Sequence, residues 1–300
     1  MKADPFLAYN SKDKSYPWSN AVKFSVILTT FNRPSVLGLV LKALNSQTYK
    51  DFEVIIADDG SGEETAQCIK RMQKEAFYKI IHDWQEPNGF RAARGRNLAA
   101  LKASGDYLIF LDGDCIPRHN FIESHYKLAQ KGYMVAGNRC LLNKELTEYL
   151  EKTQTDPGKF GFARWICEYC KRRVNRLIPL INLSSINFFR FYNKESWKKV
   201  RTCNLGVWME DFKKVNGFDG LYVGWGYEDS DLAVRLLKTG IKRKSGILAT
   251  GVLHMWHEKA DRASSDDNFK RLQERLHDNT IRAVSGLAEL ASEKESSIHE

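Results

Sequence analysis

The sequence predicts an α/β fold in which helices cover both faces of a mostly parallel central sheet. Short apolar runs typical of buried strands alternate with longer segments whose apolar residues recur at helical spacing. Three of these runs end in polar residues, Thr29, Asp58 and Asp112. Because ligands of a doubly wound sheet bind outside the carboxyl ends of its strands, these three residues predict a binding site at one edge.

The first two strand–helix units lie between residues 23 and 74. Lys23–Thr29 alternates and then becomes rich in β-branched residues, which is typical of a buried strand. Pro34 suits the first turn of the helix that follows, and apolar residues recur there as far as Leu44. A continuously apolar strand, Phe52–Ala57, and a helix over Glu63–Lys74 form the second unit.

The next units lead to a pair of carboxylates. We expect a short strand over Tyr78–His82, a helix over Ala92–Ala103 and a strand over Tyr107–Leu111 that ends in Asp112-Gly113-Asp114. The glycine frees the backbone, so both carboxylates can point to one place. Such a pair favours Mg²⁺ or Mn²⁺ and leaves positions for phosphate oxygens. An acidic turn after a buried strand is the alternative.

The carboxyl-terminal part is less regular. A long insertion runs from about Lys144 to Cys203, and we expect it to be helical. A helix is expected from Glu228 to Gly240 and a strand over Ile247–Thr250. The polar helical stretch Asp266–Ser292 carries spaced apolar residues, which suggests packing against the main domain or a partner subunit.

Composition narrows the class of protein. The chain has 300 residues with 43% hydrophobic content, enough to bury a large core. Its 46 Lys and Arg against 37 Asp and Glu give +9, which favours anionic partners such as nucleotides, nucleic acid or a membrane surface. No stretch resembles a signal peptide or a membrane span, so we expect a cytoplasmic protein. The six cysteines are scattered, which predicts reduced thiols, including the pair Cys167 and Cys170.

From about Phe24 to His257 the sequence resembles the family 2 inverting glycosyltransferases of the GT-A fold, which use nucleotide sugars. The resemblance rests first on segments similar to the family's nucleotide and metal motifs: Ser25–Arg33, Asp58–Ser61, Arg94–Asn97 and Asp112–Asp114. Two later segments, Asn216–Asp219 and Gly224–Leu232, are similar to the acceptor side of galactosyltransferase-like and chondroitin-polymerase-like members. The single Gly217, where two glycines are usual, and the long insertion depart from the pattern.

This resemblance implies a division of the chain and roles for individual residues. A loose lead (1–22) precedes the GT-A domain (23–260), and a helical extension follows (261–300). The domain has a nucleotide-binding half (23–115) and an acceptor-binding half (116–260) that holds the insertion, about 144–203. The implied nucleotide-binding residues are Thr29, Thr30, Asn32, Arg33, Asp58, Arg94, Arg96, Asp112 and Gly113. Asp114, Asp112 and His257 would hold Mn²⁺ or Mg²⁺, with Asp114 the most direct ligand and His257 preferred to His254. Trp225, Gly226 and Glu228 would bind the sugars, and Asp229 would be the catalytic base.

Each assignment has a structural alternative. Asp58 could close a turn, and Arg94 and Arg96 could be surface charges on a helix. Trp225 could be a core residue, and the acidic residues at 228–231 could cap a helix, an explanation that suits Asp231. The histidines could be ordinary loop residues.

We therefore expect a metal-dependent inverting glycosyltransferase that moves a sugar from a UDP-sugar to a carbohydrate acceptor, in the synthesis of a bacterial surface polysaccharide or lipopolysaccharide. A nucleotidyltransferase that makes nucleotide sugars is one alternative, but it would need a glycine-rich, lysine-bearing loop that Thr29–Pro34 lacks. A non-catalytic sugar-nucleotide-binding or lectin-like module is another, and the two retained acidic pairs argue against it.

The expected partners follow from the same reasoning. The acceptor is an oligosaccharide or a lipid-linked saccharide, and no nucleic acid is expected. Basic Arg164–Arg176 beside apolar Leu177–Ile181 could dock at the inner face of the plasma membrane, or could be a solvated helix beside a core segment. The carboxyl-terminal helix could also form a homo-oligomer.

Overall fold

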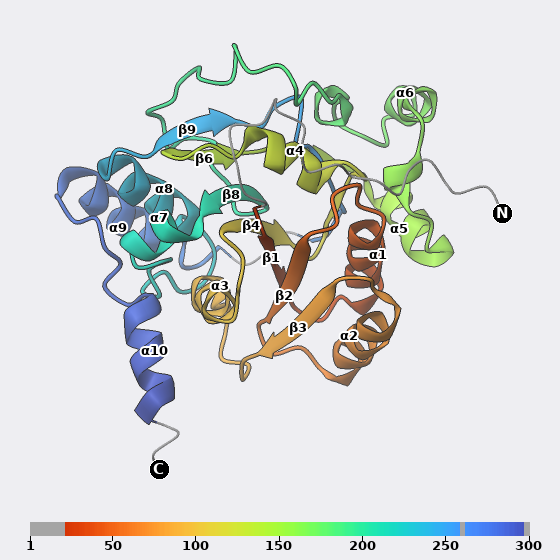
Figure 1. The fold of residues 1–300 in the computed structure, drawn as a ribbon. Helices are drawn as coiled ribbons and strands as arrows, with labels where there is room; N and C mark the ends of the chain where they lie inside the picture. Colours follow the sequence, from red (N-terminus) through yellow and green to blue (C-terminus); the bar gives the residue numbers. More distant parts are fainter. Residues whose placement is uncertain (1–21, 259–261, 297–300) are drawn as a thin grey trace.

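The computed structural model describes residues 22–258 and 262–296 (Figure 1). The loose lead expected over residues 1–22 lies outside this part of the chain, except for its last residue. Within the described residues, every helix is too short or too polar to cross a membrane.

Seven strands form the main sheet, in the spatial order β3-β2-β1-β4-β8-β6-β9. Their bounds are β1 (Phe24–Thr30), β2 (Phe52–Asp58), β3 (Lys79–Trp84), β4 (Tyr107–Asp112), β6 (Tyr133–Ala136), β8 (Asn204–Trp208) and β9 (Lys242–Ser245). The first four strands are parallel, β8 runs antiparallel to both β4 and β6, and β9 is parallel to β6. The mostly parallel sheet that the sequence predicts is thus confirmed.

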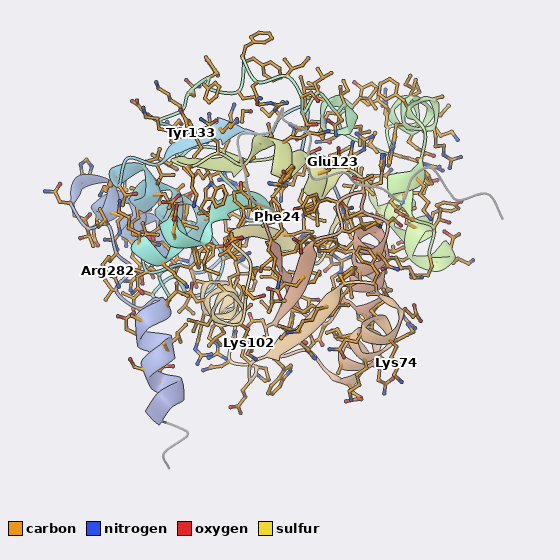
Figure 2. All side chains as sticks on the ribbon, viewed as in Figure 1. Phe24, Lys74, Lys102, Glu123, Tyr133 and Arg282 are labelled. Atoms are coloured by element: carbon orange, nitrogen blue, oxygen red, sulfur yellow. The ribbon has the colours of Figure 1, made fainter. Side chains whose placement is uncertain are left out.

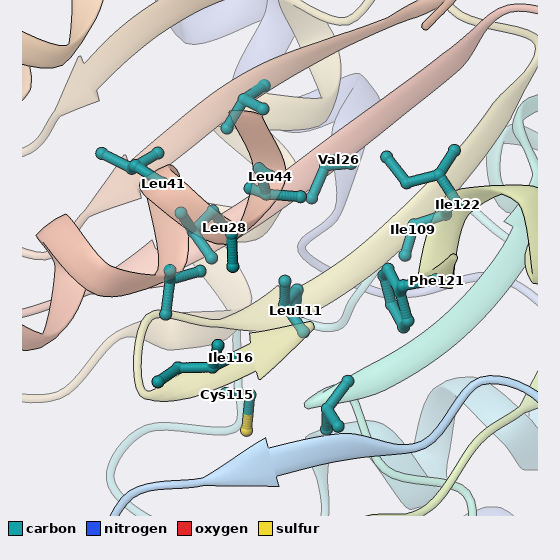
Figure 3. Close-up of a cluster of buried hydrophobic side chains, with 14 of the residues drawn as sticks. Val26, Leu28, Leu41, Leu44, Ile109, Leu111, Cys115, Ile116, Phe121 and Ile122 are labelled. Carbon is teal, nitrogen blue, oxygen red and sulfur yellow. The ribbon is translucent and has the colours of Figure 1, made fainter. Parts of the chain in front are cut away.

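Helices cover both faces because successive side chains of a strand point to opposite sides. One face packs against α1 (Pro34–Asn45), α2 (Glu63–Glu75) and α4 (Phe121–Leu128), and the other against α3 (Ala92–Leu101), α7 (Met209–Lys214) and α8 (Glu228–Lys238). In β1, Val26 and Leu28 belong to the first core and Ile27 to the second. Phe24 lies fully buried near the middle of the molecule (Figure 2), and Figure 3 shows the first core between α1 and the sheet.

A second, three-stranded sheet joins distant parts of the chain at the end of β4. It consists of β5 (Cys115–Pro117), β10 (Val252–His254) and β7 (Arg139–Leu141), with β10 in the middle. The register places His254 opposite Cys115, the residue after Asp114. Two segments about 140 residues apart therefore meet beside the acidic pair.

The prediction of a strand over Ile247–Thr250 is wrong. These residues form a turn between β9 and β10, with Leu248 at a φ of 59° and the Thr250 amide bonded to the Gly246 carbonyl. Gly246 and Gly251 explain the turn, because an added Cβ would clash with the backbone of Gly137 or of Pro179. The apolar run is thus shaped by packing against other segments.

The carboxyl-terminal helical stretch is divided into α9 (Ser265–His277) and α10 (Leu287–Ser296). The chain between them is not helical, because the Asp219 carboxylate accepts the amides of Val284 and Ser285. Leu287 and Leu290 are buried, and α10 packs on α3. Of the two expected roles, packing against the main domain is therefore the one that is observed.

The insertion is only partly helical. It contains α5 (Lys144–Thr153), α6 (Phe162–Cys170) and two short 3₁₀ turns, η1 (Pro157–Lys159) and η2 (Ile178–Leu180). Cys167 and Cys170 lie on α6 as expected, and all six cysteines are free. From residue 181 to residue 203 the insertion has neither helix nor strand.

Candidate active site

The polar strand ends predicted to meet do so at one edge of the main sheet. Thr29 pairs with Asp112 between β1 and β4, and Thr30 pairs with Asp58 between β1 and β2. The Thr29 hydroxyl donates to Asp112 Oδ1 at 3.0 Å. The sheet topology therefore brings three motifs that are far apart in the sequence to one place.

The turn after β4 depends on its glycine. The Gly113 amide donates to the Thr29 carbonyl at 2.7 Å, and a Cβ at residue 113 would lie 2.6 Å from that oxygen. No other residue fits so close to β1 without moving the backbone. Gly113 thus fixes the backbone positions from which the Asp112 and Asp114 side chains extend.

Asp114 lies among nitrogen donors. His257 Nε2 is 3.4 Å and His254 Nε2 is 3.7 Å from its carboxylate, and Arg33 Nη1 is 3.5 Å away. One carboxylate and two imidazoles suit Mn²⁺, and the ligand atoms of all three lie close enough to share an ion. Burial lowers the pKa of His254, which favours the neutral imidazole that a metal requires. We call Asp114, His254 and His257 the metal side of the site.

Asp112 is not part of that group. Its carboxylate instead receives Arg96 Nη2 at 3.2 Å and Thr29 Oγ1. Asp112 also lies near the thiols of Cys115 and Cys203. Burial, followed by a hydrogen bond with Cys203, raises the pKa of Cys115 well above its usual value, so this thiol stays protonated and is a poor ligand for a hard cation.

Arg96 connects Asp112 to the other side of the site. Its Nη1 donates to Glu228 at 3.0 Å while Nη2 donates to Asp112, and the guanidinium is almost fully buried. Burial alone would lower the pKa of Arg96, but the charges of Asp112 and Glu228 raise it overall. A permanent cation therefore lies between two carboxylates from opposite halves of the domain.

Asp229 lies in the first turn of α8, after a loop with unusual backbone. Gly224, Gly226 and Tyr227 all have positive φ, and nothing lies within 4 Å of a Cβ built at Gly226. The Asp229 side chain is only 13% exposed. Burial, and next the charge of Glu228, raises its pKa to about 6. The resulting group is ionised at neutral pH but can accept a proton readily. We call Trp225, Glu228 and Asp229 the acceptor side.

Asp231 has a different role from Asp229. It is fully buried and pairs with Arg235 of the same helix and with Arg275 of α9, at 2.7 and 2.9 Å. The capping interpretation of Asp231 is therefore replaced by a buried ion-pair network that joins α8 to α9.

Trp225 is 37% exposed, so it is not a core residue. The Arg262 guanidinium lies 4.5 Å from its ring centroid, in a cation–π contact. Its indole therefore remains available as a wall of a sugar site, as the resemblance implies.

The nucleotide residues near β1 and β2 are brought together. Asp58 closes the turn after β2 by accepting the Ser61 amide, and its other oxygen lies 2.8 Å from His82 Nε2. Burial alone would raise the pKa of Asp58, but these hydrogen bonds lower it overall. Asn32, at a φ of 47°, accepts the Gly62 amide and donates its own amide to Ser61.

Arg94 does not reach the acidic cluster, so its expected contact with the diphosphate stays a prediction. It bonds to Gln85 and to Glu293 of α10, and lines a pocket of about 560 Å³ with Trp84 and Lys102. Residues two apart on a helix point about 200° from each other, so Arg94 faces away when Arg96 faces the site.

Sequence reasoning missed His82, Arg139 and Arg201. The sequence predicts only a strand position for His82, and no motif marks Arg139, although its charge acts on Asp112. Arg201 Nε lies 4.0 Å from Asp229 Oδ2. It comes from the end of the insertion, where no motif marks it, so only the fold reveals it.

Two protein-family models match this chain. The model of glycosyl transferase family 2 matches residues 25–201, and that of the N-terminal domain of galactosyltransferase matches residues 184–259. The chain is 28% identical over 250 residues to hyaluronan synthase of Pasteurella multocida, covering 78% of this chain and 25% of that protein. It spans between a quarter and about half of the length of the first curated relatives that it matches.

Solved structures share the fold at low identity. S. aureus TarS 1-349 in complex with UDP-GlcNAc gives a TM-score of 0.59 at 14% identity, over 89% of this chain and 69% of that one. A mannosyltransferase from Pyrobaculum calidifontis in complex with GDP-Man and Mn²⁺ gives 0.51 at 16%, over 82% and 62%. The expected GT-A fold is therefore confirmed. Since the family model covers more than half of its length, the chain belongs to glycosyl transferase family 2.

Proposed function

We propose that this chain is a metal-dependent, inverting glycosyltransferase that moves one sugar from a UDP-sugar to a carbohydrate acceptor. One observation carries the proposal: buried Arg96 bridges Asp112, beside the metal side, to Glu228, next to a nearly buried carboxylate of raised pKa. A nucleotide site and a base must lie on either side of one donor sugar for inversion, and this arrangement supports both.

The metal side would hold the diphosphate. Asp114 with His254 and His257 would bind Mn²⁺ or Mg²⁺, which when present neutralises the charge developing on the leaving UDP. The mannosyltransferase neighbour, whose complex contains Mn²⁺, supports this choice of ion. Arg33 and Arg96 add cationic charge from the protein, and Asp58 and Asn32 would accept hydrogen bonds from the nucleoside.

The acceptor side would supply the proton transfer. An acceptor hydroxyl attacks the anomeric carbon from the face opposite the diphosphate, the new C–O bond forms, and the bond to UDP breaks. The hydroxyl proton passes to Asp229, whose pKa of about 6 suits a base at neutral pH. Glu228 would hold acceptor hydroxyls, and Trp225 would stack on a pyranose ring.

Polysaccharide synthesis is the expected setting. Two relatives matched over 78% of this chain are named hyaluronan synthase and chondroitin synthase, two matched over 74% are named validoxylamine A glucosyltransferase, and the TarS complex contains UDP-GlcNAc. These names support a UDP-sugar donor and a surface-polysaccharide product in a bacterium. They leave the transferred sugar and the linkage to experiment.

The test begins with donor binding. Calorimetry and thermal stabilisation with UDP-glucose, UDP-galactose and their N-acetyl forms, each with and without Mn²⁺, should identify one donor that binds only with metal. Asp114→Asn should weaken this binding by more than about 100-fold, because even outer partners of metal ligands typically cost 10–100-fold. Exposed Asp51→Asn is the matched control and should bind normally.

Turnover then separates the remaining functions. UDP release in the presence of an acceptor panel is expected of a transferase. Donor binding without any UDP release across the panel would favour a sugar-nucleotide-binding module. If Asp114→Asn kept its metal-dependent affinity, the metal side would be assigned wrongly.

A further inference from the structure

One segment of the chain carries its whole net charge. Residues 157–203 contain eleven Lys and Arg and two Glu, which gives +9. The complete chain is also +9, so all other residues together are neutral. The basic character that suggests an anionic partner is therefore a property of this segment, which we call the basic segment.

The positive charge of the basic segment faces outward. Glu168, one of its two acids, is fully buried and paired with Arg164 and Arg173. Lys171, Arg172 and Arg176 follow α6 and are exposed. Within the part of the chain that the structure describes, none of these three takes part in a salt bridge. They are thus free to meet an external anion.

Apolar side chains point outward from the same segment. On α6, Phe162, Ile166 and Tyr169 follow one another at helical spacing and are exposed, while Trp165 and Glu168 face inward. Further exposed apolar residues follow outside the helix: Ile178, Leu183, Ile186, Phe188 and Tyr192. An amphipathic helix of a globular domain normally turns its apolar residues inward, so α6, which buries Trp165, still leaves a second apolar row exposed.

The exposed rings after α6 flank a firmly anchored residue. Arg190 is fully buried and donates to four carbonyls, those of Leu183, Ile186, Ser245 and Ile247. These bonds tie the segment to the turn after β9. Phe188 is nevertheless 85% and Tyr192 76% exposed on either side of it. Their exposure is therefore built into the fold.

The basic segment lies along one border of the molecule. In Figure 1 it runs from α6 across the top of the view, above β9 and β6, and the Phe191 ring contacts Tyr133 of β6 at 5.4 Å. Figure 2 shows Tyr133 on this upper side and Lys74 of α2 on the opposite, lower side. Charge and exposed apolar groups thus gather on one side of the chain.

We infer that the basic segment docks the protein on the surface of an anionic lipid bilayer. Aromatic and aliphatic side chains enter the boundary between headgroups and acyl chains, while Lys and Arg bind the anionic headgroups. A soluble polyanion would be bound by the charges alone and gives no use to Phe162, Phe188 or Tyr192. The combination of both features favours the bilayer.

Docking here would also orient the site. The Arg176 carbonyl accepts a hydrogen bond from the Cys140 thiol of β7, and Arg201 lies beside Asp229. The basic segment is thus attached to β7 near its middle and ends beside Asp229. An acceptor carried by a membrane lipid would reach Asp229 from this side, an orientation that rests on the proposed function. The docking itself does not.

The test is flotation with phosphatidylcholine vesicles that contain either no or 40 mol% phosphatidylglycerol, without donor or acceptor. The wild type should float only with the anionic vesicles. Lys171→Gln/Arg172→Gln/Arg176→Gln should bind about 100-fold more weakly, since each surface charge contributes about fivefold. Lys70→Gln/Lys74→Gln/Lys79→Gln, on the opposite side, is the charge-matched control and should bind within about threefold of wild type.

A second pair of variants tests the apolar contribution. Phe188→Ser/Tyr192→Ser should weaken vesicle binding by about tenfold or more, and exposed Leu221→Ser/Val284→Ser should not. Metal-dependent UDP binding, measured on every variant, reports whether the fold and the site are intact. The inference is overturned if wild type ignores anionic vesicles, or if both triple variants lose binding equally. It is also overturned if the aromatic variant binds normally while heparin competes fully, because the charges would then serve a soluble polyanion.

Discussion

The metal side and the acceptor side hold their carboxylates in opposite surroundings. Asp114 meets Arg33, His254 and His257 within 3.7 Å, so positive or neutral donors surround its charge. Asp229 is similarly little exposed, but its first neighbour in the chain is Glu228, and its only cation within salt-bridge distance among the described residues is Arg201, at 4.0 Å. An ion-binding carboxylate has to stay ionised, whereas a base has to accept a proton. The two surroundings match these two tasks.

The same contrast exists within one turn of α8. Asp231 is fully buried with two arginines, while Asp229 is nearly buried with a like charge beside it. Burial is therefore not what distinguishes the two. The two carboxylates differ in the number of cations paired with them, and this difference makes Asp231 a stabilising group and Asp229 a reactive one.

The largest effect should come from Asp229→Asn. Removing a general base costs about two to four orders of magnitude in rate. Metal-dependent UDP-sugar affinity should stay near wild type, because Asp229 lies on the acceptor side. Initial rates at saturating donor and acceptor, with calorimetry of donor binding, measure both. Near-normal turnover would move the base to Glu228.

Asp231→Asn should instead lower the free energy of unfolding. Its removal leaves Arg235 buried without its paired carboxylate and takes one of three carboxylates from Arg275, and breaking a buried pair typically costs about 3–5 kcal/mol. At pH 8, Asp229→Asn should instead raise the free energy of unfolding. The folded pKa of about 6 lies above the ordinary 3.8, so the ionised carboxylate lowers stability as the pH rises through this range. The amide removes that cost, which is at most about 3 kcal/mol.

Urea denaturation of both variants at pH 8 and pH 5 tests this pair. The gain from Asp229→Asn should shrink at pH 5, where the native carboxyl is largely protonated. Equal destabilisation by both variants would mean that Asp229 is a structural residue, and the comparison between the two carboxylates would fail.

Arg96→Gln should damage both sides of the site at once. It leaves Asp112 and Glu228 without the cation that they share, so donor affinity and rate should each fall by about 10–100-fold. Arg94→Gln, two residues earlier on the same helix, is the matched control and should change both by less than about threefold. A larger loss with Arg94→Gln would restore Arg94 to the diphosphate site.

The smallest effect concerns pH. If Asp229 is the base, activity should rise with pH through an apparent pKa near 6, because the ionised form is the active one. Arg201→Gln removes a charge that lowers this pKa, so the rising limb should move up by about half a unit to one unit. Exposed Arg271→Gln should leave the profile unchanged. If Arg201→Gln does not shift the rising limb of the pH–activity profile, that limb reports the titration of a group other than Asp229.

Much of the nucleotide half is predictable from the sequence. The strands and helices from Phe24 to Asp112 have the expected order, and their ends differ from expectation by only one or two residues. The reason is that period, apolar runs and turn residues are local properties of the chain. The same local logic places Asp112 and Asp114 around Gly113 at a strand end.

Beyond residue 115 local patterns still predict α8 to within two residues, but they no longer suffice for every element. The apolar run Ile247–Thr250 is a turn because Gly246 and Gly251 pack against other segments, and the last helix is interrupted because Asp219 binds the backbone between α9 and α10. Pro179, on which Gly251 packs, and Asp219 are both far in sequence from the segments that they shape. Such contacts override propensity and leave no local mark.

The sequence alone therefore determined the mostly parallel sheet, its polar edge and the acidic turn, because these follow from side-chain alternation and glycine geometry. Only the tertiary structure decided which of Arg94 and Arg96 faces the site, since spacing tells that they diverge but not which one turns inward. It also brought His254 beside Asp114 and Arg201 beside Asp229. Electrostatic environments of this kind arise from side chains that meet across the fold, and so they exist only once the chain has folded.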